Sequence, residues 1–461
     1  MYAQRFRSHF DFLSTDPAFI AFLAEDGGNP DARMAMGLEM TDEEWAELQR
    51  RDVVASRAID VRRAVTGRSF DDAEEAQELT HRIPTGPVFA GLWQDQMDGG
   101  RLKLAVTDAS SLQLDTLDGL FARGSDDFVV IEQQYSLDEL YAWRDVIWER
   151  ITTTSASAGV GFNYSDSGVR LRLELYPGST LADSEPILAG IPRGQVLIIE
   201  REGPVEFGAP WRNHGSSQMA GLRIGIYGGT EMVPCTWGLS GHTSSFAYLV
   251  TAGHCVTGVG TVLSGHGYRS VTQNEWNTNN YISAPNAFVY ARNKDTSAAL
   301  DFARIQLHSN YANSNGNCYH GSTSSNTVHC VVRTKYRLSL YGHTVGQYVC
   351  ASLGMTAQFK CGTVVDADMS GVFAGQSFVN RVEANICGTW GDSGSGIINS
   401  STNATIHGIL TNGWPCDLPP HIGGVLFVPA YYVKAYIGAT SYDFNCVWSG
   451  SWWGSCPIVY S

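Results

Sequence analysis

The chain has 461 residues, of which 43% are hydrophobic and 11% aromatic, so it is too long for one ordinary domain and apolar enough for at least two buried cores. Its net charge of −15 is confined to the first half, because residues 1–220 carry −16 and residues 221–461 carry +1. Neither half offers a basic surface, which excludes electrostatic capture of nucleic acid or of an anionic membrane as the main function.

Two helices are predicted in the first half from capping boxes followed by apolar residues at helical spacing. Thr41 and Glu44 open a helix over residues 41–66, and Ser136 and Glu139 open a second one. Each pair places a hydroxyl and a carboxylate where they satisfy the first amides of a helix.

Two β-hairpins are predicted beside these helices. Residues 88–93 and 102–106 flank the turn Asp98-Gly99-Gly100, and residues 159–164 and 169–175 flank Asp166-Ser167-Gly168. The first half is therefore expected to be an α+β unit.

The second half shows short β-rich runs separated by polar, Gly-rich loops, and no convincing helix. The clearest runs are residues 246–251, 302–307, 362–365 and 406–410. This pattern is typical of an all-β barrel or sandwich. Residues 201–221 contain Pro and Gly with few periodic apolar residues, so we expect an exposed, easily cleaved linker there.

All ten cysteines lie between Cys235 and Cys456, in the charge-poor half. An even number in such a segment predicts a disulfide framework formed in an oxidising compartment. A zinc site is the alternative, but the chain has no C-x-x-C pair. We therefore expect no zinc site.

The N-terminus gives little sign of an export signal. Its only apolar run, Phe19 to Ala24, is shorter than the apolar core of a signal peptide and too short to span a bilayer. If the protein is secreted to the extracellular space, as the cysteines suggest, a signal has been trimmed or the start is misassigned.

The strongest local motif is Gly391-Asp392-Ser393-Gly394-Ser395-Gly396. Glycines on both sides allow a sharp turn that exposes the hydroxyl of Ser393 and aims the amides of Gly391 and Ser393 at one point, as an oxyanion hole requires. The alternative is an ordinary flexible glycine loop.

A serine is a poor nucleophile unless a histidine takes its proton and a carboxylate orients that histidine. His254 in Thr-Ala-Gly-His-Cys follows one apolar strand, and Asp301 in Leu-Asp-Phe-Ala opens another. Alone, His254 could be a core histidine and Asp301 a strand-start acid. Together with Ser393 they give the order His, Asp, Ser in one disulfide-rich half.

These residues resemble the chymotrypsin-like serine proteases, and most closely the bacterial secreted alpha-lytic protease and streptogrisin group, over roughly residues 222–435. The resemblance implies three disulfides, Cys235–Cys255, Cys350–Cys361 and Cys387–Cys416. Outside it, Cys318 with Cys330 and Cys446 with Cys456 are expected to close small loops. The segment 89–93 with its hairpin and the Ser136 helix is similar to the pro-regions of the same group.

The resemblance implies a fold of two six-stranded antiparallel β-barrels with His254, Asp301 and Ser393 in the cleft between them. It divides the chain into an α+β pro-region (1–205), a processing linker (206–221), a protease domain (222–440) and an aromatic tail (441–461). Substrate is expected to add as an extended strand against Thr411, Asn412 and Gly413.

The resemblance implies a secreted serine endopeptidase that is made as a zymogen, is a monomer when mature and requires no metal or organic cofactor. The linker composition and the shift in charge and cysteine use predict that it cleaves itself between Arg201 and Thr230. Its partners are then polypeptide substrates and its own pro-region. The segments that line the specificity pocket in the family, Gly388 to Trp390, Leu410 to Gly413 and Val425 to Phe427, hold neither acid nor base. We therefore expect an apolar or aromatic P1 residue, the one before the cut bond.

Three features leave alternatives open. The family usually has Gly-Gly after the nucleophile, whereas this chain has Gly394-Ser395. The tail tryptophans Trp448, Trp452 and Trp453 could bind a polysaccharide or pack on the protease surface. The chain could also be a catalytically silent binding protein, or its first half could act in trans as a chaperone or inhibitor.

Overall fold

The computed structural model describes a large part of both halves of the chain. The described residues are 6–8, 10, 12, 15–23, 28–32, 39–67, 85–112, 117, 119–121, 126–154, 156–176, 178–200, 223–228, 231–242, 247–257, 270–272, 301–306, 317–320, 328–331, 333–335, 343–354, 358–373, 376–389, 391–399, 406–413, 424–430 and 443–445.

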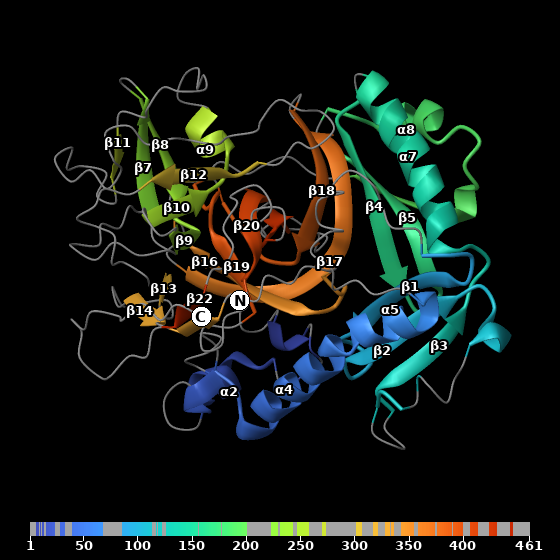
Figure 1. Cartoon of the computed structure of the whole chain (residues 1–461), viewed down its shortest axis with the longest axis horizontal. Helices are drawn as coiled ribbons and strands as arrows, with labels where there is room; N and C mark the ends of the chain where they lie inside the picture. Colours follow the sequence, from blue (N-terminus) through green and yellow to red (C-terminus); the bar gives the residue numbers. More distant parts are fainter. Residues whose placement is uncertain are drawn as a thin grey trace.

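The first half is an α+β unit, as predicted (Figure 1). Its elements are α2 (Pro17–Phe22), α4 (Asp42–Ser56), α5 (Ala58–Thr66), β1 (Phe89–Asp95), β2 (Arg101–Val106), η3 (Ala109–Ser111), β3 (Phe128–Glu132), α7 (Leu137–Thr153), β4 (Ala158–Ser165), β5 (Gly168–Leu175), α8 (Leu181–Ile187), η4 (Arg193–Gln195) and β6 (Val196–Glu200).

Both predicted capping boxes are confirmed, at Thr41 for α4 and at Ser136 for α7. The single helix predicted over residues 41–66 is wrong, because it divides at Arg57 into α4 and α5. The hydroxyl of Ser56 donates to the carbonyl of Val53 at 2.6 Å, and the amide of Arg57 turns back to Val54 at 3.0 Å. A side chain that competes for a helix carbonyl in this way interrupts the regular ladder.

Both predicted hairpins are confirmed. β1 pairs antiparallel with β2, and β4 pairs antiparallel with β5 around a two-residue turn between Ser165 and Gly168. β3 and β6 each add in parallel to these hairpins, on β2 and β5. Helix α7 contacts β4 and buries Leu140, Ile147 and Ile151.

The described part of the second half is almost entirely β-structure. Its elements are β7 (Arg223–Gly228), β8 (Glu231–Thr236), β9 (Leu239–His242), β10 (Ala247–Thr251), α9 (His254–Thr257), β11 (Ser270–Thr272), β12 (Ala303–Gln306), β13 (Asn317–His320), β14 (Val328–Val331), β15 (Arg333–Lys335), β16 (Tyr348–Leu353), β17 (Gln358–Phe373), β18 (Gln376–Ala384), β19 (Gly396–Ile398), β20 (Ile406–Gly413), β21 (Val425–Pro429) and β22 (Asp443–Asn445). The one helix among the described residues of this half, α9, is a single short turn that the sequence did not predict.

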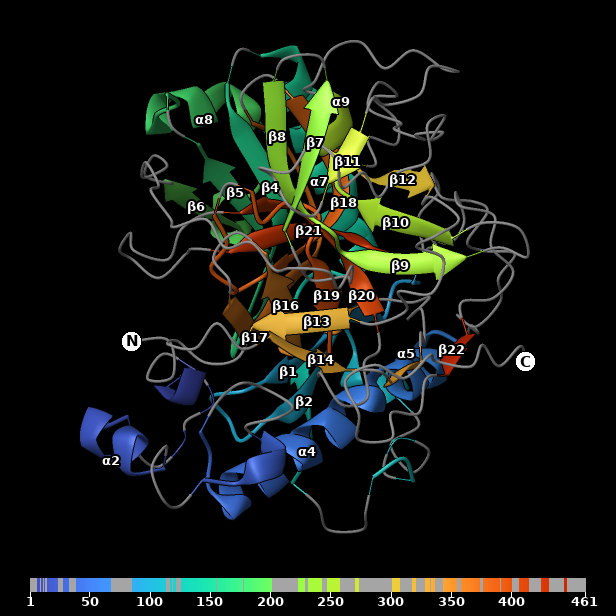
Figure 2. The same ribbon diagram turned by 90° about the vertical axis from the view of Figure 1, so that its left-hand side faces the viewer.

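Six strands of the second half form a closed ring in the order β16-β19-β20-β21-β18-β17, because β17 also pairs with β16. The strands β7 to β12 lie beside this ring as two three-stranded sheets, β11-β7-β8 and β12-β10-β9 (Figure 2). The site lies where these two groups of strands meet. Closure of β7–β12 into a second barrel stays a prediction.

The two halves share one sheet, which the sequence did not predict. β17 runs past the barrel and pairs with β4, so that β4, β5 and β6 extend the barrel strands into a nine-stranded sheet (Figure 1). A second contact joins β1 to residues 343–346, where the amide of Gln94 donates to the carbonyl of Val345 at 2.7 Å. One hydrophobic cluster accordingly includes Phe162 from the first half and Phe427 from the second.

Two of the expected disulfides, Cys235–Cys255 and Cys350–Cys361, are present. Cys387 is also disulfide-bonded, and its expected partner Cys416 lies outside the described residues. Cys318 and Cys330 occupy directly opposite positions of the β13–β14 pair. Cys446, Cys456 and the three tail tryptophans lie outside the described residues. No described helix has the length and apolar character needed to cross a membrane.

Candidate active site

His254 and Asp301 are brought together by two neighbouring strands. β10 and β12 pair antiparallel, and His254 follows the end of β10 while Asp301 precedes the start of β12. The side chain of His254 binds Oδ2 of Asp301 through Nδ1 at 2.7 Å, and the backbone amide of His254 donates to Oδ1 at 2.6 Å. Both carboxylate oxygens therefore hold the histidine in one orientation.

The electrostatics of this pair favour a basic imidazole. Burial lowers the pKa of His254, but the charge and hydrogen bond of Asp301 outweigh it, and the pKa of His254 lies above its ordinary 6.5. Burial raises the pKa of Asp301, but the charge and hydrogen bond of His254 outweigh it, and the pKa of Asp301 lies below its ordinary 3.8. Asp301 stays ionised and can stabilise a protonated imidazole.

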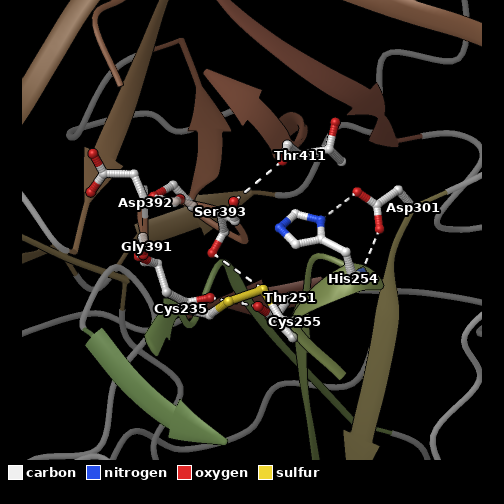
Figure 3. Close-up of a disulfide and its surroundings, with 11 residues drawn as sticks. Cys235, Thr251, His254, Cys255, Asp301, Gly391, Asp392, Ser393 and Thr411 are labelled. Atoms are coloured by element: carbon white, nitrogen blue, oxygen red, sulfur yellow. Dashed lines mark hydrogen bonds and ion pairs between the residues drawn. A yellow bond between two sulfur atoms is a disulfide. The ribbon is translucent and has the colours of Figure 1, made fainter. Parts of the chain in front are cut away.

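Ser393 lies on the opposite side of the ring from Asp301. Figure 3 shows the imidazole of His254 between the Asp301 carboxylate and the Ser393 side chain. In this conformation the hydroxyl of Ser393 donates to the carbonyl of Thr411 at 3.3 Å. Rotation about the Cα–Cβ bond of Ser393 moves the hydroxyl toward the ring, and hydrogen bonds of this kind often tighten only when substrate binds.

The loop around Ser393 leaves two amides unused within the described part of the chain. The amide of Asp392 donates to Thr389 at 3.0 Å and that of Gly394 to Leu410 at 2.7 Å, while the described hydrogen bonds include none from the amides of Gly391 and Ser393. Buried amides almost always find partners, so these two amides beside Ser393 are available to a bound oxygen atom, as the expected oxyanion hole would require.

The loop around Ser393 is held from behind by the ends of β8 and β10. The amide of Thr236 donates to the carbonyl of Ser393 at 2.8 Å, and its hydroxyl donates to the carbonyl of Gly391 at 3.0 Å. Gly394 has a φ of +93°, and a Cβ there would come within 2.1 Å of Oγ1 of Thr251. Only glycine fits this approach.

Sequence reasoning missed Thr236, Thr251 and Arg381. Thr236 directly follows Cys235, and the Cys235–Cys255 disulfide ties that position to the residue after His254, so it could have been found from the cysteines. Arg381 is 1% exposed on β18, and its charge lowers the pKa of both His254 and Asp301. A single arginine in a strand gives no such signal in the sequence.

The segments expected to line a specificity pocket lie against one another. Gly388 comes from the loop before Ser393, Gly413 ends β20, and Val425 begins β21. A Cβ at Gly413 would lie 3.4 Å from Cα of Gly388, and a Cβ at Gly388 would lie 3.0 Å from Cγ1 of Val425. Leu410 and Phe427 are buried beside them, whereas Trp390 lies outside the described residues.

The family model of trypsin matches residues 228–435. Among solved structures, a glutamic acid-specific serine protease is 18% identical, with a TM-score of 0.36 over 49% of this chain and 100% of its own. Protease A of Thermobifida fusca is 20% identical, with a TM-score of 0.33 over 48% of this chain and 97% of its own. An alpha-lytic protease homologue, N4, is 19% identical, with a TM-score of 0.34 over 48% of this chain and 98% of its own. No curated protein matches the chain.

The matched segment begins at the last residue of β7 and ends after β21, so it contains β8 to β12, the six strands of the ring and all three candidate site residues. The family predicted from the sequence motifs is thereby confirmed. Residues 228–435 of the chain therefore match the trypsin family, as the motifs around His254, Asp301 and Ser393 predicted.

Proposed function

We propose that the protein is a serine endopeptidase that hydrolyses peptide bonds through an acyl-enzyme on Ser393. The observation that carries this proposal is the imidazole of His254, held at 2.7 Å by Asp301 on one side and facing Ser393 on the other. A carboxylate at Nδ1 keeps the proton on that nitrogen, which leaves the lone pair of Nε2 directed at the hydroxyl.

The proposed reaction uses each of these groups in turn. Nε2 of His254 takes the proton of Ser393 as Oγ attacks the substrate carbonyl carbon, and the resulting oxyanion accepts hydrogen bonds from the amides of Gly391 and Ser393. His254 then protonates the leaving amine, which releases the first product. Water, deprotonated by the same imidazole, hydrolyses the ester and regenerates the serine.

The first half is proposed to be a pro-region that leaves when the chain is cut between Arg201 and Thr230. Its shared sheet with the barrel, together with the change in charge and cysteine use near residue 221, supports two modules made as one precursor. The disulfides support folding in an oxidising compartment and hence secretion.

Substrate is proposed to bind as an extended strand along the end of β20. Asn412 is partly exposed and Gly413 is exposed there, next to the Thr411 carbonyl that meets the Ser393 hydroxyl. Among the described residues, Asn412 and Gly413 pair only with β21, on one side. The other edge would give a substrate main-chain hydrogen bonds that do not depend on its sequence.

The pocket residues support an uncharged P1 side chain. The contact between Gly388 and Gly413 favours a small apolar P1 side chain over a large one. An aromatic ring between two walls needs about 7 Å, twice the usual carbon–carbon contact distance of roughly 3.5 Å. Val425 fills the remaining space and is fully buried.

Replacing Val425 with glycine should therefore widen the pocket. In peptide anilides that differ only at P1, Val425→Gly should raise kcat/KM for Phe relative to Ala by about tenfold or more. Val428→Gly is the matched control, because it removes a buried valine of the same strand that points to the opposite face. If the ratio of kcat/KM for Phe to that for Ala is unchanged in Val425→Gly, Val425 does not line the pocket.

A fluorophosphonate probe tests the proposed function directly, because it reacts only with an activated serine. Peptide mass spectrometry of the labelled chain should place the adduct on Ser393, and His254→Ala should abolish labelling. If the full-length chain is shielded by its first half, labelling is expected after cleavage within residues 201–230. An adduct elsewhere, or none on the cleaved protein, contradicts the proposal and supports a silent binding protein.

A further inference from the structure

Two histidines are buried against each other in the second half. His343 precedes β16 and His407 lies on β20, and their ring centroids are 5.1 Å apart. The ring of His343 also packs edge-on against Phe427 of β21, with centroids 5.0 Å apart. His343 is 3% exposed and His407 is 2% exposed. The proposed reaction uses neither imidazole.

Most ring nitrogens of this pair have no hydrogen-bond partner. His343 uses one nitrogen for the backbone of His407, whereas its Nε2 and both ring nitrogens of His407 are unpaired among the described residues. Buried polar groups are nearly always paired, so three unpaired nitrogens in one place are unusual. A protonated ring fits such a site worse than a neutral one, because the proton adds both a donor and a full charge that need partners.

The surroundings of the pair are poor in charge. β19 and β21, which pair with β20, carry no titratable side chain. The elements next to the segment that contains His343 carry a few. They are Arg51 and Asp52 on α4, Asp95 on β1, Tyr348 on β16, and Lys360, Asp366 and Asp368 on β17.

Both histidines are held neutral by this environment. Burial, followed by the charge of His407, lowers the pKa of His343 well below its ordinary 6.5. Burial alone lowers the pKa of His407 from 6.5 to about 4. No described carboxylate offsets these effects, so a proton on either ring is a buried charge without a counter-ion.

The segment that carries the first of these histidines also holds the first half. Residues 343–346 lie between β17 and β1, because the amide of Gly346 donates to β17 at 2.8 Å and the carbonyl of Val345 accepts the amide of Gln94 at 2.7 Å. The side chain of Gln96 adds a bond to the carbonyl of Gly346 at 2.7 Å. A Cβ at Gly346 would come within 1.7 Å of the Gln94 carbonyl oxygen, so the fit is close. A shift of residues 343–346 therefore breaks the contact with β1.

The two histidines differ in how easily they reach water. His407 lies within β20, which pairs with β19 on one side and with β21 on the other. His343 lies outside the regular strands, in a segment held by single hydrogen bonds to its neighbours. Openings that break few hydrogen bonds require the least free energy. A charge on either ring is therefore relieved most readily by movement of residues 343–346, which exposes His343 and uncovers His407.

We propose that His343 and His407 form an acid-sensitive switch, in which residues 343–346 hold β1 while both rings are neutral and release it when either ring is protonated. The contact between β1 and the barrel is then firm at neutral pH and weaker in acid. Its regulatory meaning rests on the proposed function, in which the first half must leave before the enzyme works.

Acid should favour the open contact. A histidine whose pKa is lowered in the closed state stabilises that state fully above pH 6.5 and loses this contribution as pH falls from 6.5 toward the lowered pKa. Each pKa unit corresponds to a tenfold change, so one released histidine should raise the opening equilibrium by about a hundredfold at pH 4.5. Asp52 and Asp366 cannot cause this effect, because burial raises the pKa of both carboxyls and thereby favours the closed state in acid.

Hydrogen exchange on the full-length Ser393→Ala chain tests the switch without any catalysis. Protection of peptides that span residues 91–96 and 343–348, corrected for intrinsic exchange, should fall by ~10–100-fold between pH 7.5 and 4.5. The β4–β5 hairpin contains no histidine and serves as the internal reference, so its protection should change far less. Equal corrected protection of the two peptides at both pH values overturns the switch.

Substitutions of the two histidines complete the test. His343→Asn keeps a donor near the position of Nδ1, and His407→Leu keeps a side chain of similar size, but neither new residue can take up a proton. Each should reduce the pH effect, and the double variant should abolish it. His254→Asn removes a histidine whose pKa is raised, so this matched control should retain the full effect.

A full-sized pH effect in both single variants contradicts the switch, so the decision does not depend on the folding of the double variant. A pH effect that is lost in His254→Asn contradicts it as well. Fluorophosphonate labelling tests the catalytic proposal separately, so either proposal can fail while the other stands.

Discussion

A chain with Ser393→Ala is expected to stay intact, whereas the unmodified chain separates into two pieces by cutting within residues 201–230. The hydroxyl is the proposed nucleophile and no neighbouring group can replace it, so peptide hydrolysis should also fall by about 10⁵-fold or more. Intact-mass measurement of the purified protein follows the cut, and a peptide anilide follows the hydrolysis.

Ser395→Ala is the matched control for this prediction. Its buried hydroxyl donates to the carbonyl of Asp392 at 2.7 Å, so its loss should cost about 1 kcal/mol of stability without preventing self-cleavage. A Ser393→Ala precursor that still matures when purified alone would show that a different residue, or a contaminating protease, makes the cut.

Asp301→Asn should lower kcat by about 10⁴-fold while leaving the fold in place. An amide at this position no longer fixes the proton on Nδ1 and cannot stabilise the imidazolium that forms during attack. The substitution also removes the charge that holds the pKa of His254 above 6.5.

The pH profile distinguishes this catalytic role from a purely structural one. Activity requires neutral His254, so the acid limb of the parent should lie above pH 6.5 and that of Asp301→Asn should move to lower pH. Fluorophosphonate labelling of Ser393 should also be correspondingly slower in Asp301→Asn than in the parent. A variant that retains a tenth of the activity, or an acid limb that does not move, would argue against Asp301 as the partner of His254.

Features set by neighbouring residues could be predicted from the sequence. The capping boxes at Thr41 and Ser136 and the turn after Ser165 each depend on a few adjacent side chains, and the structure has them where expected. The candidate site residues were predicted for a related reason, since His254, Asp301 and Ser393 each lie in a short local motif, and the three motifs together, in that order, indicated the chemistry.

What could not be predicted depends on pairings between distant segments. The edge of β4 meets β17 through backbone groups that carry no sequence code, and Arg172 looks like any strand arginine until Asp366 and Glu383 lie beside it. The break at Arg57 was not predicted, because a serine such as Ser56 usually does not interrupt a helix. The contact between Gly388 and Gly413 likewise follows from how the strands close, and two glycines in a list of pocket residues do not reveal it.

The strand that joins the two halves also bears on how the chain reaches its native state. Arg144 and Asp368, which meet across this junction, are 224 positions apart, and contacts between such remote residues form slowly. The β4–β5 hairpin needs only its own short turn, emerges first during synthesis and offers a finished edge. β17 can then add to a template that already exists, which shortens the search for the rest of the barrel.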